Sequence, residues 1–389
     1  MDRPSATAIP VTIACFLTYF AMSGMLAPIG LISKPLSQVL GQSVPEVTQQ
    51  FSWLTFGILV GAGLALVIVN VMELKRLIVA IYALSTAALV SLALHSQALG
   101  FWLALFVVGT CFGIGLAAAA TSIARLYTDA RRASMLVITD SCFSIAGFVT
   151  AGLAVRFVAA EMHWASAYLV IAGVCGLIVL ISLSSRFPEA PSDHASQTGV
   201  SGAWPAGVWL CIAALFVYTL GQNAMLWWLP NYLSEVHGAP AAEAGAVVGQ
   251  FWTGMFLTQL FVAWFVFKTG VSRLVMVGAV TTLVGSVPLW LVDDAGVSAW
   301  LAFGWGVANL GMLKMTLSFG TQLARVPSGA VVSALLFGST SGTAVSPFVT
   351  GEIAQLGGYL AVLQFSSLCY AVLLALIVLA RSSYRPAVA

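Results

Sequence analysis

Long apolar segments fill most of the chain, and short polar segments separate them. A helix needs about 20 apolar residues to cross the ~30 Å hydrocarbon core of a membrane. Several of these segments contain Gly or Pro, which membrane-spanning helices tolerate. The expected spans cover residues 9–33, 48–71, 76–95, 99–124, 133–158, 163–184, 205–233, 242–267, 272–292, 297–322, 328–355 and 358–380. The pattern therefore predicts an all-α membrane protein with twelve transmembrane helices.

The longest polar stretch runs from Arg186 to Ala203, between the sixth and seventh spans, and contains Pro188, Pro191 and Asp193. This composition is typical of a linker. It divides the chain into an N-terminal six-helix bundle over residues 1–185, a linker over residues 186–204 and a C-terminal six-helix bundle over residues 205–389.

The two halves share short matches in the same order, and both halves begin on the same side of the membrane. A parallel repeat of this kind predicts two pseudo-symmetric bundles with the binding site at their interface. The first halves of the matches are Trp102-Leu103-Ala104, Thr121-x-Ile123-Ala124-Arg125 and Phe148-Val149-Thr150, and they recur as Trp300-Leu301-Ala302, Thr321-x-Leu323-Ala324-Arg325 and Phe348-Val349-Thr350.

The distribution of Lys and Arg predicts the orientation. Of the 15 Lys and Arg residues, twelve fall on the side shared by both termini, two fall on the other side, and Lys314 lies within a span. Positive residues accumulate on the cytoplasmic side of membrane proteins. We therefore expect a multi-pass protein of the bacterial inner (plasma) membrane with cytoplasmic N- and C-termini.

The composition excludes several classes of function. Hydrophobic residues make up 60% of the chain and charged residues only 7%, with a net charge of +2, so we expect a lipid bilayer and no nucleic acid as partner. The six cysteines all fall in apolar segments, as small buried hydrophobic residues do. The four histidines lie at or beyond span ends, and no metal-ligand spacing exists. Neither a cofactor, a metal site nor an enzyme is expected.

Two opposite charges lie deep within spans. Asp140 follows Arg132 by eight residues, or ~12 Å of helix, and Lys314 precedes Arg325 by eleven residues, or ~16 Å. A charge near the bilayer centre costs at least a few kcal/mol and usually marks a transport pathway. The hypothesis is that Asp140 and Lys314 form an ion pair across the bundle interface that couples transport to protons. The alternative is a static pair that only joins two helices.

The seventh span carries further polar candidates. Gln222 and Asn223 are adjacent amides within an apolar segment, and Trp227 follows them by one turn. We expect the amides to line the solute cavity, or else to bond across helices. Trp227 is expected to stack on the solute, or else to lie in the interfacial belt with Trp228.

The tenth and first spans complete the candidate site. Trp305 and Asn309 share one helical face, and Lys314 lies somewhat around from it, so the expectation is a cavity face that bears all three residues. Tyr19 in the first span is the remaining candidate for substrate binding.

The chain resembles the major facilitator superfamily over its whole length, through its 6+6 spans and central linker. Within it, the segment Ile138-Thr139-Asp140-Ser141-x-Phe143-Ser144-x-Ala146-Gly147 is similar to span five of the TsgA-like branch, near the fucose–proton symporters. The resemblance implies alternating access through a central cavity. The chain departs from the family in lacking a span-four Arg, acids in spans one and four, and the Gly-Pro motif of antiporters.

Together these observations predict a secondary active transporter for a small polar solute, anionic solutes included, driven by protons and acting as a monomer. The alternatives are a proton-antiport exporter of drugs or metabolites such as siderophores, and a non-transporting membrane sensor.

Overall fold

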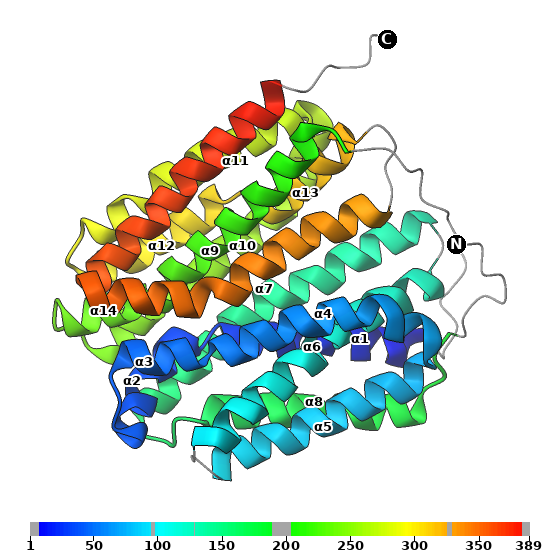
Figure 1. Ribbon diagram of the computed structural model, residues 1–389, viewed down its shortest axis with the longest axis horizontal. Coiled ribbons are helices and arrows are strands. Elements are labelled where there is room, and N and C mark those ends of the chain that lie inside the picture. Colours follow the sequence, from blue (N-terminus) through cyan, green and yellow to red (C-terminus); the bar gives the residue numbers. More distant parts are fainter. Residues whose placement is uncertain (1–7, 95–97, 128, 189–203, 325–328, 383–389) are drawn as a thin grey trace. The chain divides into compact units, whose positions relative to one another are not determined.

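The computed structural model describes residues 8–94, 98–127, 129–188, 204–324 and 329–382, and these residues are almost entirely helical (Figure 1). Eleven helices in this described part are long and apolar enough to cross a membrane. The last of them, α14 (Gly329–Ser382), has 54 residues and bends at Gly358, where φ is 76°. A straight helix of that length would measure ~81 Å, far more than one bilayer thickness. It therefore supplies two spans, and the predicted count of twelve is confirmed.

The chain divides into two compact units, Met1–His194 and Ala195–Ala389. We call them the N-terminal and C-terminal units. Residues 189–203 of the predicted linker lie outside the described residues.

The N-terminal unit begins with α1 (Ala8–Leu26), which is followed after Pro28 by the shorter α2 (Ile29–Leu40) and α3 (Val44–Gln50). Its other helices are α4 (Ser52–Val71), α5 (Leu74–Leu94), α6 (Ala98–Leu126), α7 (Asp129–Ala159) and α8 (Ser166–Ser184). In this unit α4 packs on α6, α1 packs on α7, and α5 packs on α8.

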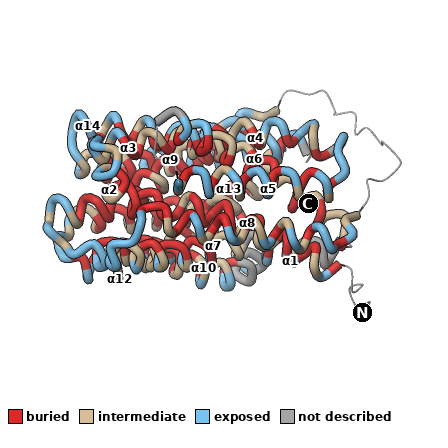
Figure 2. The backbone as a smooth tube through the Cα atoms, turned by 90° about the horizontal axis from the view of Figure 1, so that it is seen from below, coloured by how far each residue is buried: buried red, intermediate tan, exposed pale blue. Residues whose placement is uncertain are grey.

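The C-terminal unit contains α9 (Ala206–Glu235), α10 (Ala241–Thr269), α11 (Val271–Ser286), a 3₁₀ turn (Pro288–Trp290), α12 (Ala295–Ala308), α13 (Met312–Leu323) and α14. Helix α9 packs on α14, and α10 packs on α12. Most residues of α9 are buried (Figure 2), so this helix forms the centre of its unit.

Glycines bring specific helix pairs into backbone contact. A Cβ atom added to Gly57 of α4 would lie 2.4 Å from the carbonyl oxygen of Phe106, and one added to Gly109 of α6 would lie 2.0 Å from that of Leu54. Small residues let helix backbones approach this closely. The same arrangement joins α10 to α12, where Gly254 faces Phe303 and Gly306 faces Phe251.

These contacts fix the register of the repeat. Gly57 corresponds to Gly254 and Gly109 to Gly306, a spacing of 197 residues in both cases. The match of Trp102 with Trp300 is therefore wrong by one residue, because its spacing is 198. Farther along, Phe148 and Phe348 are 52% and 57% exposed, and the threonines two residues later are both buried. The predicted spacing of 200 residues is thus reproduced in the burial of α7 and α14.

Helix α14 also contacts α9 through glycines. Added Cβ atoms at Gly338 and Gly342 would lie 2.6 Å and 2.2 Å from the carbonyl oxygens of Ile212 and Phe216. The hydroxyl group of Thr219 donates to the carbonyl oxygen of Ser339 at 2.8 Å. The glycines of this part of α14 therefore allow its close packing on α9.

Candidate functional site

The tenth span is broken at its centre. Helix α12 ends at Ala308, and α13 begins at Met312. Between them Leu310 and Gly311 adopt left-handed backbone conformations, with φ of 46° and 62°. A residue with a side chain in that region costs roughly 1–2 kcal/mol. The helical spacing that relates Trp305 and Asn309 to Lys314 is therefore interrupted after Asn309, and a cavity face bearing all three residues stays a prediction.

The break removes hydrogen bonds that a continuous helix would make. The backbone N–H of Met312 donates to the carbonyl oxygen of Asn309 at 2.8 Å, so the Ala308 carbonyl loses its ordinary partner. The backbone N–H of Leu310 reaches back only three residues, to the Val307 carbonyl at 3.2 Å. Buried carbonyl groups need replacement donors inside a membrane.

Side-chain hydroxyls from neighbouring helices replace the donor lost at the Ala308 carbonyl and add a second donor at the Val307 carbonyl. Thr258 of α10 donates to the Val307 carbonyl at 3.2 Å. Thr281 of α11 lies 2.6 Å from the Ala308 carbonyl, the shortest of its three acceptor distances. The break is therefore satisfied by its surroundings and is not frayed.

Asn309 is held at the break by both ends of its amide. Its Oδ1 accepts from the hydroxyl group of Tyr218 on α9 at 2.8 Å, and its Nδ2 donates to the Trp305 carbonyl at 3.1 Å. The side chain is fully buried. Its polar atoms thus bond to protein groups within the C-terminal unit.

Lys314 lies in the first turn of α13, where its backbone N–H donates to the Gly311 carbonyl at 2.9 Å. The residue is half-buried. The N-terminal end of a helix carries partial positive charge, which disfavours a cation there by up to about 1 kcal/mol. The break thus places the positive end of a helix beside the Lys314 ammonium group.

Asp140 lies within α7 of the N-terminal unit, but its side chain falls outside the described residues. Asp140 and Lys314 belong to different units, and their pairing stays a prediction.

The two amides of α9 differ in their surroundings. Gln222 is 8% exposed, and its Nε2 contacts the sulfur atom of Met255 on α10 at 3.9 Å. Asn223 is half-buried, and its Nδ2 is shielded from solvent with no hydrogen-bond partner among the described residues. An unmet buried donor costs about 1–3 kcal/mol. Asn223 therefore has the stronger need for a ligand or water oxygen.

The tryptophan candidates are core residues of the C-terminal unit. Trp305 is 1% exposed and packs on Phe251 at a centroid distance of 4.4 Å and on Tyr370 at 6.0 Å. Trp227 is also buried, and the neighbouring Trp228 packs on Tyr359 at 5.6 Å. The expectation of an interfacial belt for Trp227 and Trp228 is wrong, because both rings lie among protein side chains.

Tyr19 is half-buried at the side of a hydrophobic cluster of the N-terminal unit. The cluster joins α1 to the C-terminal end of α6 and consists of Val11, Cys15, Ala119, Ile123 and Tyr127. The hydroxyl groups of Tyr127 and Thr12 lie 2.7 Å apart, which ties these helices together. Tyr19 thus shares its surroundings with packing residues.

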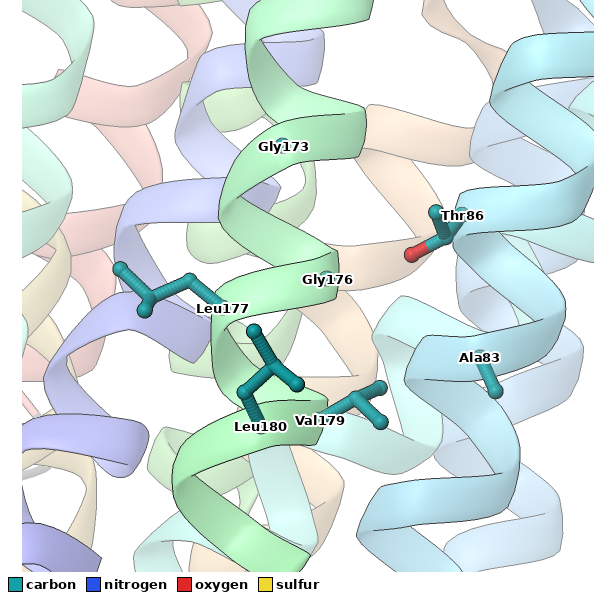
Figure 3. A pocket seen from close by; sticks show the side chains of 7 residues that line it. All are labelled: Ala83, Thr86, Gly173, Gly176, Leu177, Val179 and Leu180. Carbon is teal, nitrogen blue, oxygen red and sulfur yellow. The ribbon is translucent and has the colours of Figure 1, made fainter.

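A shallow groove lies between α5 and α8 (Figure 3). Gly173 and Gly176 leave it open, since an added Cβ atom at either would meet nothing within 4 Å. The hydroxyl group of Thr86 donates to the Tyr82 carbonyl of its own helix. The groove contains none of the predicted site residues, and its apolar lining suits a lipid-facing surface.

The sequence analysis missed Tyr218, Thr258 and Thr281 as partners of the tenth span. Each is a hydroxyl residue in an apolar helix and could have bonded to its own backbone instead. The available signal was the change in repeat spacing from 197 at Gly306 to 200 at Thr321, which places three extra residues in the tenth span relative to the fourth.

Similar proteins share this fold. The nucleoside transporter NupG superposes with a TM-score of 0.71 at 14% identity, over 98% of this chain and 100% of that one. A D-xylose-proton symporter superposes with a TM-score of 0.72 at 13% identity, over 94% of this chain and 96% of that one.

Relatives by sequence carry the name TsgA. The Protein TsgA homolog of Erwinia tasmaniensis is 28% identical over 372 residues, which cover 94% of this chain and 93% of the relative. Protein TsgA of Shigella dysenteriae serotype 1 is 27% identical over 381 residues, covering 95% and 94%. The family model of the Major Facilitator Superfamily matches residues 11–347. The chain therefore belongs to the major facilitator superfamily and is a multi-pass membrane transporter rather than an enzyme, similar in sequence to the TsgA proteins.

Proposed function

We propose that this transporter moves a small polar solute with an anionic group across the bacterial inner membrane by alternating access coupled to protons. The observation that carries the proposal is the position of Lys314, a half-buried ammonium group in the first turn of α13, at the break of the tenth span. A cation at that depth and at that helix end is unfavourable on its own. An anionic solute would offset this cost when bound.

Asp140 is proposed as the proton-carrying group. It is the acid that the sequence places deepest in the first half, within α7, and its charge is opposite to that of Lys314. Protonation of Asp140 would remove one charge from the membrane interior, which makes a carboxylate suited to coupling. Its proposed partnership with Lys314 would link proton binding to solute binding.

The proposed solute contacts beyond Lys314 are Gln222 and Asn223, with Tyr19, Trp227, Trp305 and Asn309 as further candidates. The unmet Nδ2 of Asn223 and the weak contact of Gln222 with a sulfur atom support amide donors that a solute oxygen would satisfy. The burial of Trp227 and Trp305 favours a supporting role for these rings.

The solved structures that share the fold agree with a polar solute. One is named as a nucleoside transporter and another as a D-xylose-proton symporter. Both solutes are small and rich in oxygen atoms, and the second name includes proton coupling. The likeness supports a small polar solute, whereas the anionic group is inferred from Lys314 alone.

The arrangement in the membrane is part of the proposal. Both termini and the linker over residues 186–204 are proposed to face the cytoplasm, with the bundles over residues 1–185 and 205–389 acting within one monomer. Labelling of single cysteines introduced at Ser5 and Ser192 from either side of the membrane tests the orientation. Labelling of both from the outside of intact cells would contradict it.

A thermal-shift screen of the purified protein followed by uptake measurements tests the function. Nucleosides, pentoses, carboxylates and siderophores are compared, since a bound solute raises the apparent melting temperature by mass action. Solutes that raise it are then offered to proteoliposomes under a proton gradient of either direction, which separates import from export. Stabilisation by neutral solutes alone would overturn the anionic assignment.

The matched variants for uptake are Lys314→Gln and Lys34→Gln. Loss of uptake in the first and retention in the second is the expected result. Equal uptake by both variants would remove Lys314 from the proposal. Uptake that persists unchanged without a proton gradient would remove proton coupling.

A further inference from the structure

We propose that Tyr218, Thr258 and Thr281 are positioning residues for transport. Their hydroxyl groups hold the tenth span broken at residues 309–311 and thereby fix where α13 carries Lys314. The inference rests on the proposed function only in giving Lys314 a role in the transport cycle. The break and its hydroxyl donors stand on the geometry alone.

The break is an asymmetry between the two halves of the repeat. Gly109 and Gly306 correspond at a spacing of 197 residues, whereas Thr121 and Thr321 correspond at 200. Three additional residues therefore lie between Gly306 and Thr321. The corresponding α6 is one continuous helix, whereas the tenth span is divided into α12 and α13.

A hydroxyl group accompanies the break at the equivalent packing position. In the first half, Gly61 of α4 faces the carbonyl oxygen of Thr110, with 2.1 Å to an added Cβ atom. The same register in the second half places Thr258 against Val307, and there the threonine donates to the carbonyl at 3.2 Å. The unbroken α6 is thus contacted at this position by Gly61, whereas the broken tenth span is contacted by Thr258, whose hydroxyl group donates a hydrogen bond.

Donors from three helices meet consecutive groups of the break. Thr258 of α10 reaches the Val307 carbonyl, Thr281 of α11 reaches the Ala308 carbonyl, and Tyr218 of α9 reaches the Asn309 side chain. Helix α11 fits closely at this point, since a Cβ atom added to Gly278 would lie 2.8 Å from the Met312 sulfur atom. A frayed helix end would not be matched by donors from three directions.

The direction of Lys314 depends on this arrangement. An α-helix turns by about 100° per residue. If the three additional residues of the tenth span were part of a continuous helix, they would rotate the Lys314 side chain by about 300° about the helix axis relative to α12. The left-handed residues Leu310 and Gly311 replace that rotation with a change of helix direction. Loss of the hydroxyl donors favours other arrangements of α13, in which Lys314 is less buried.

Acetylation of the lysines in the purified full-length protein tests the inference. The probe is sulfo-N-hydroxysuccinimide acetate, and mass spectrometry measures the rate at Lys314 relative to Lys34. In Tyr218→Phe, Thr258→Val and Thr281→Val the relative rate should rise about fivefold, the population change that one net hydrogen bond is worth. The matched control is Thr253→Val, because the Thr253 hydroxyl bonds only to the Gly249 carbonyl of its own helix.

Conservative variants separate positioning from general packing. Thr258→Ser and Thr281→Ser keep the donor and should return the Lys314 rate to that of the unmodified protein, although each loses a methyl group. Should a hydroxyl variant fail to fold, the same measurement is made with Leu310→Gly added, which relieves the left-handed strain and offsets part of the lost stability. In that background the hydroxyl variants should still raise the Lys314 rate above that of Leu310→Gly alone, and an unchanged rate would overturn the positioning role.

The outcomes distinguish this inference from the proposed function. Equal Lys314 rates in all variants and in Thr253→Val would overturn the positioning role and leave the role of Lys314 in uptake untouched. Loss of the serine rescue would overturn it as well. Conversely, full uptake by Lys314→Gln would remove the solute role of Lys314, while the hydroxyl-dependent rates would still establish the break as a held structure.

Discussion

The hydroxyl group of Tyr218 donates to Oδ1 of Asn309 at 2.8 Å, and both side chains are buried within the C-terminal unit. This hydrogen bond joins the central helix α9 to the point at which the tenth span breaks. The other end of the Asn309 amide bonds to the Trp305 carbonyl, so the residue is fixed from two sides.

Removing the Tyr218 hydroxyl should destabilise the protein. Tyr218→Phe leaves the buried Asn309 oxygen without its donor, which costs about 1–3 kcal/mol. The matched variant is Thr282→Val, because the buried Thr282 hydroxyl has no hydrogen-bond partner among the described residues. We expect a lower apparent melting temperature for the first variant and no decrease for the second. Equal shifts would mean that the Tyr218–Asn309 bond contributes nothing to stability.

The left-handed pair at the break predicts opposite effects of two small changes. Leu310→Gly removes an unfavourable backbone conformation and should stabilise the protein by about 1 kcal/mol. Gly311→Ala introduces one and should destabilise it by a similar amount. Chemical or thermal unfolding in detergent measures both. Gly304→Ala serves as the control within α12, where an added Cβ atom meets nothing within 4 Å.

The glycine contacts between α4 and α6 should tolerate no side chain. A Cβ atom at Gly109 would lie 2.0 Å from a backbone oxygen, which no rotamer change can relieve. Gly109→Ala and its repeat equivalent Gly306→Ala should both reduce the yield of monodisperse protein in size-exclusion chromatography. Gly152→Ala, at a helical site with open space, should be neutral or stabilising by up to about 1 kcal/mol. Normal yields of Gly109→Ala would contradict the packing.

The charge hypothesis predicts a compensation between two substitutions. If Asp140 and Lys314 act together, each single change, Asp140→Asn or Lys314→Gln, leaves an uncompensated charge in the membrane and costs about 3–5 kcal/mol. The double variant should be more stable than either single variant, and the charge swap should also recover stability. Thermal unfolding of the unmodified protein, the two single variants and the double variant measures the coupling free energy between Asp140 and Lys314. Additive losses in the double variant would show that the two residues act separately.

The positions of the membrane-spanning helices could be predicted from the sequence, but the break within the tenth span could not. Runs of about 20 apolar residues locate spans well, because hydrocarbon thickness imposes that length. The break at residues 309–311 occupies only three residues of an apolar run, and Asn309 and Gly311 are each compatible with a spanning helix. The break can be recognised only when the two halves are aligned residue by residue. That alignment comes from the backbone contacts of Gly254 with Phe303 and of Gly57 with Phe106.

The candidate site illustrates the same limit. The sequence singled out Trp227 and Asn309 as polar or aromatic residues within spans, but their neighbours decide what they do. Trp227 is enclosed by protein, and Asn309 bonds to Tyr218 and Trp305. These partners lie up to 91 residues apart in the chain, so local pattern alone could not reveal them.

The glycine contacts between α10 and α12 stop at Gly306, and the span continues beyond the break as α13, which packs on α9, α11 and α14. In the other unit the contacts between α4 and α6 extend along an unbroken helix to Gly113. The first half of the repeat therefore contains one continuous helix, α6, where the second half contains two helices, α12 and α13, that are joined at residues 309–311. The two halves therefore stop being mechanically equivalent at Leu310.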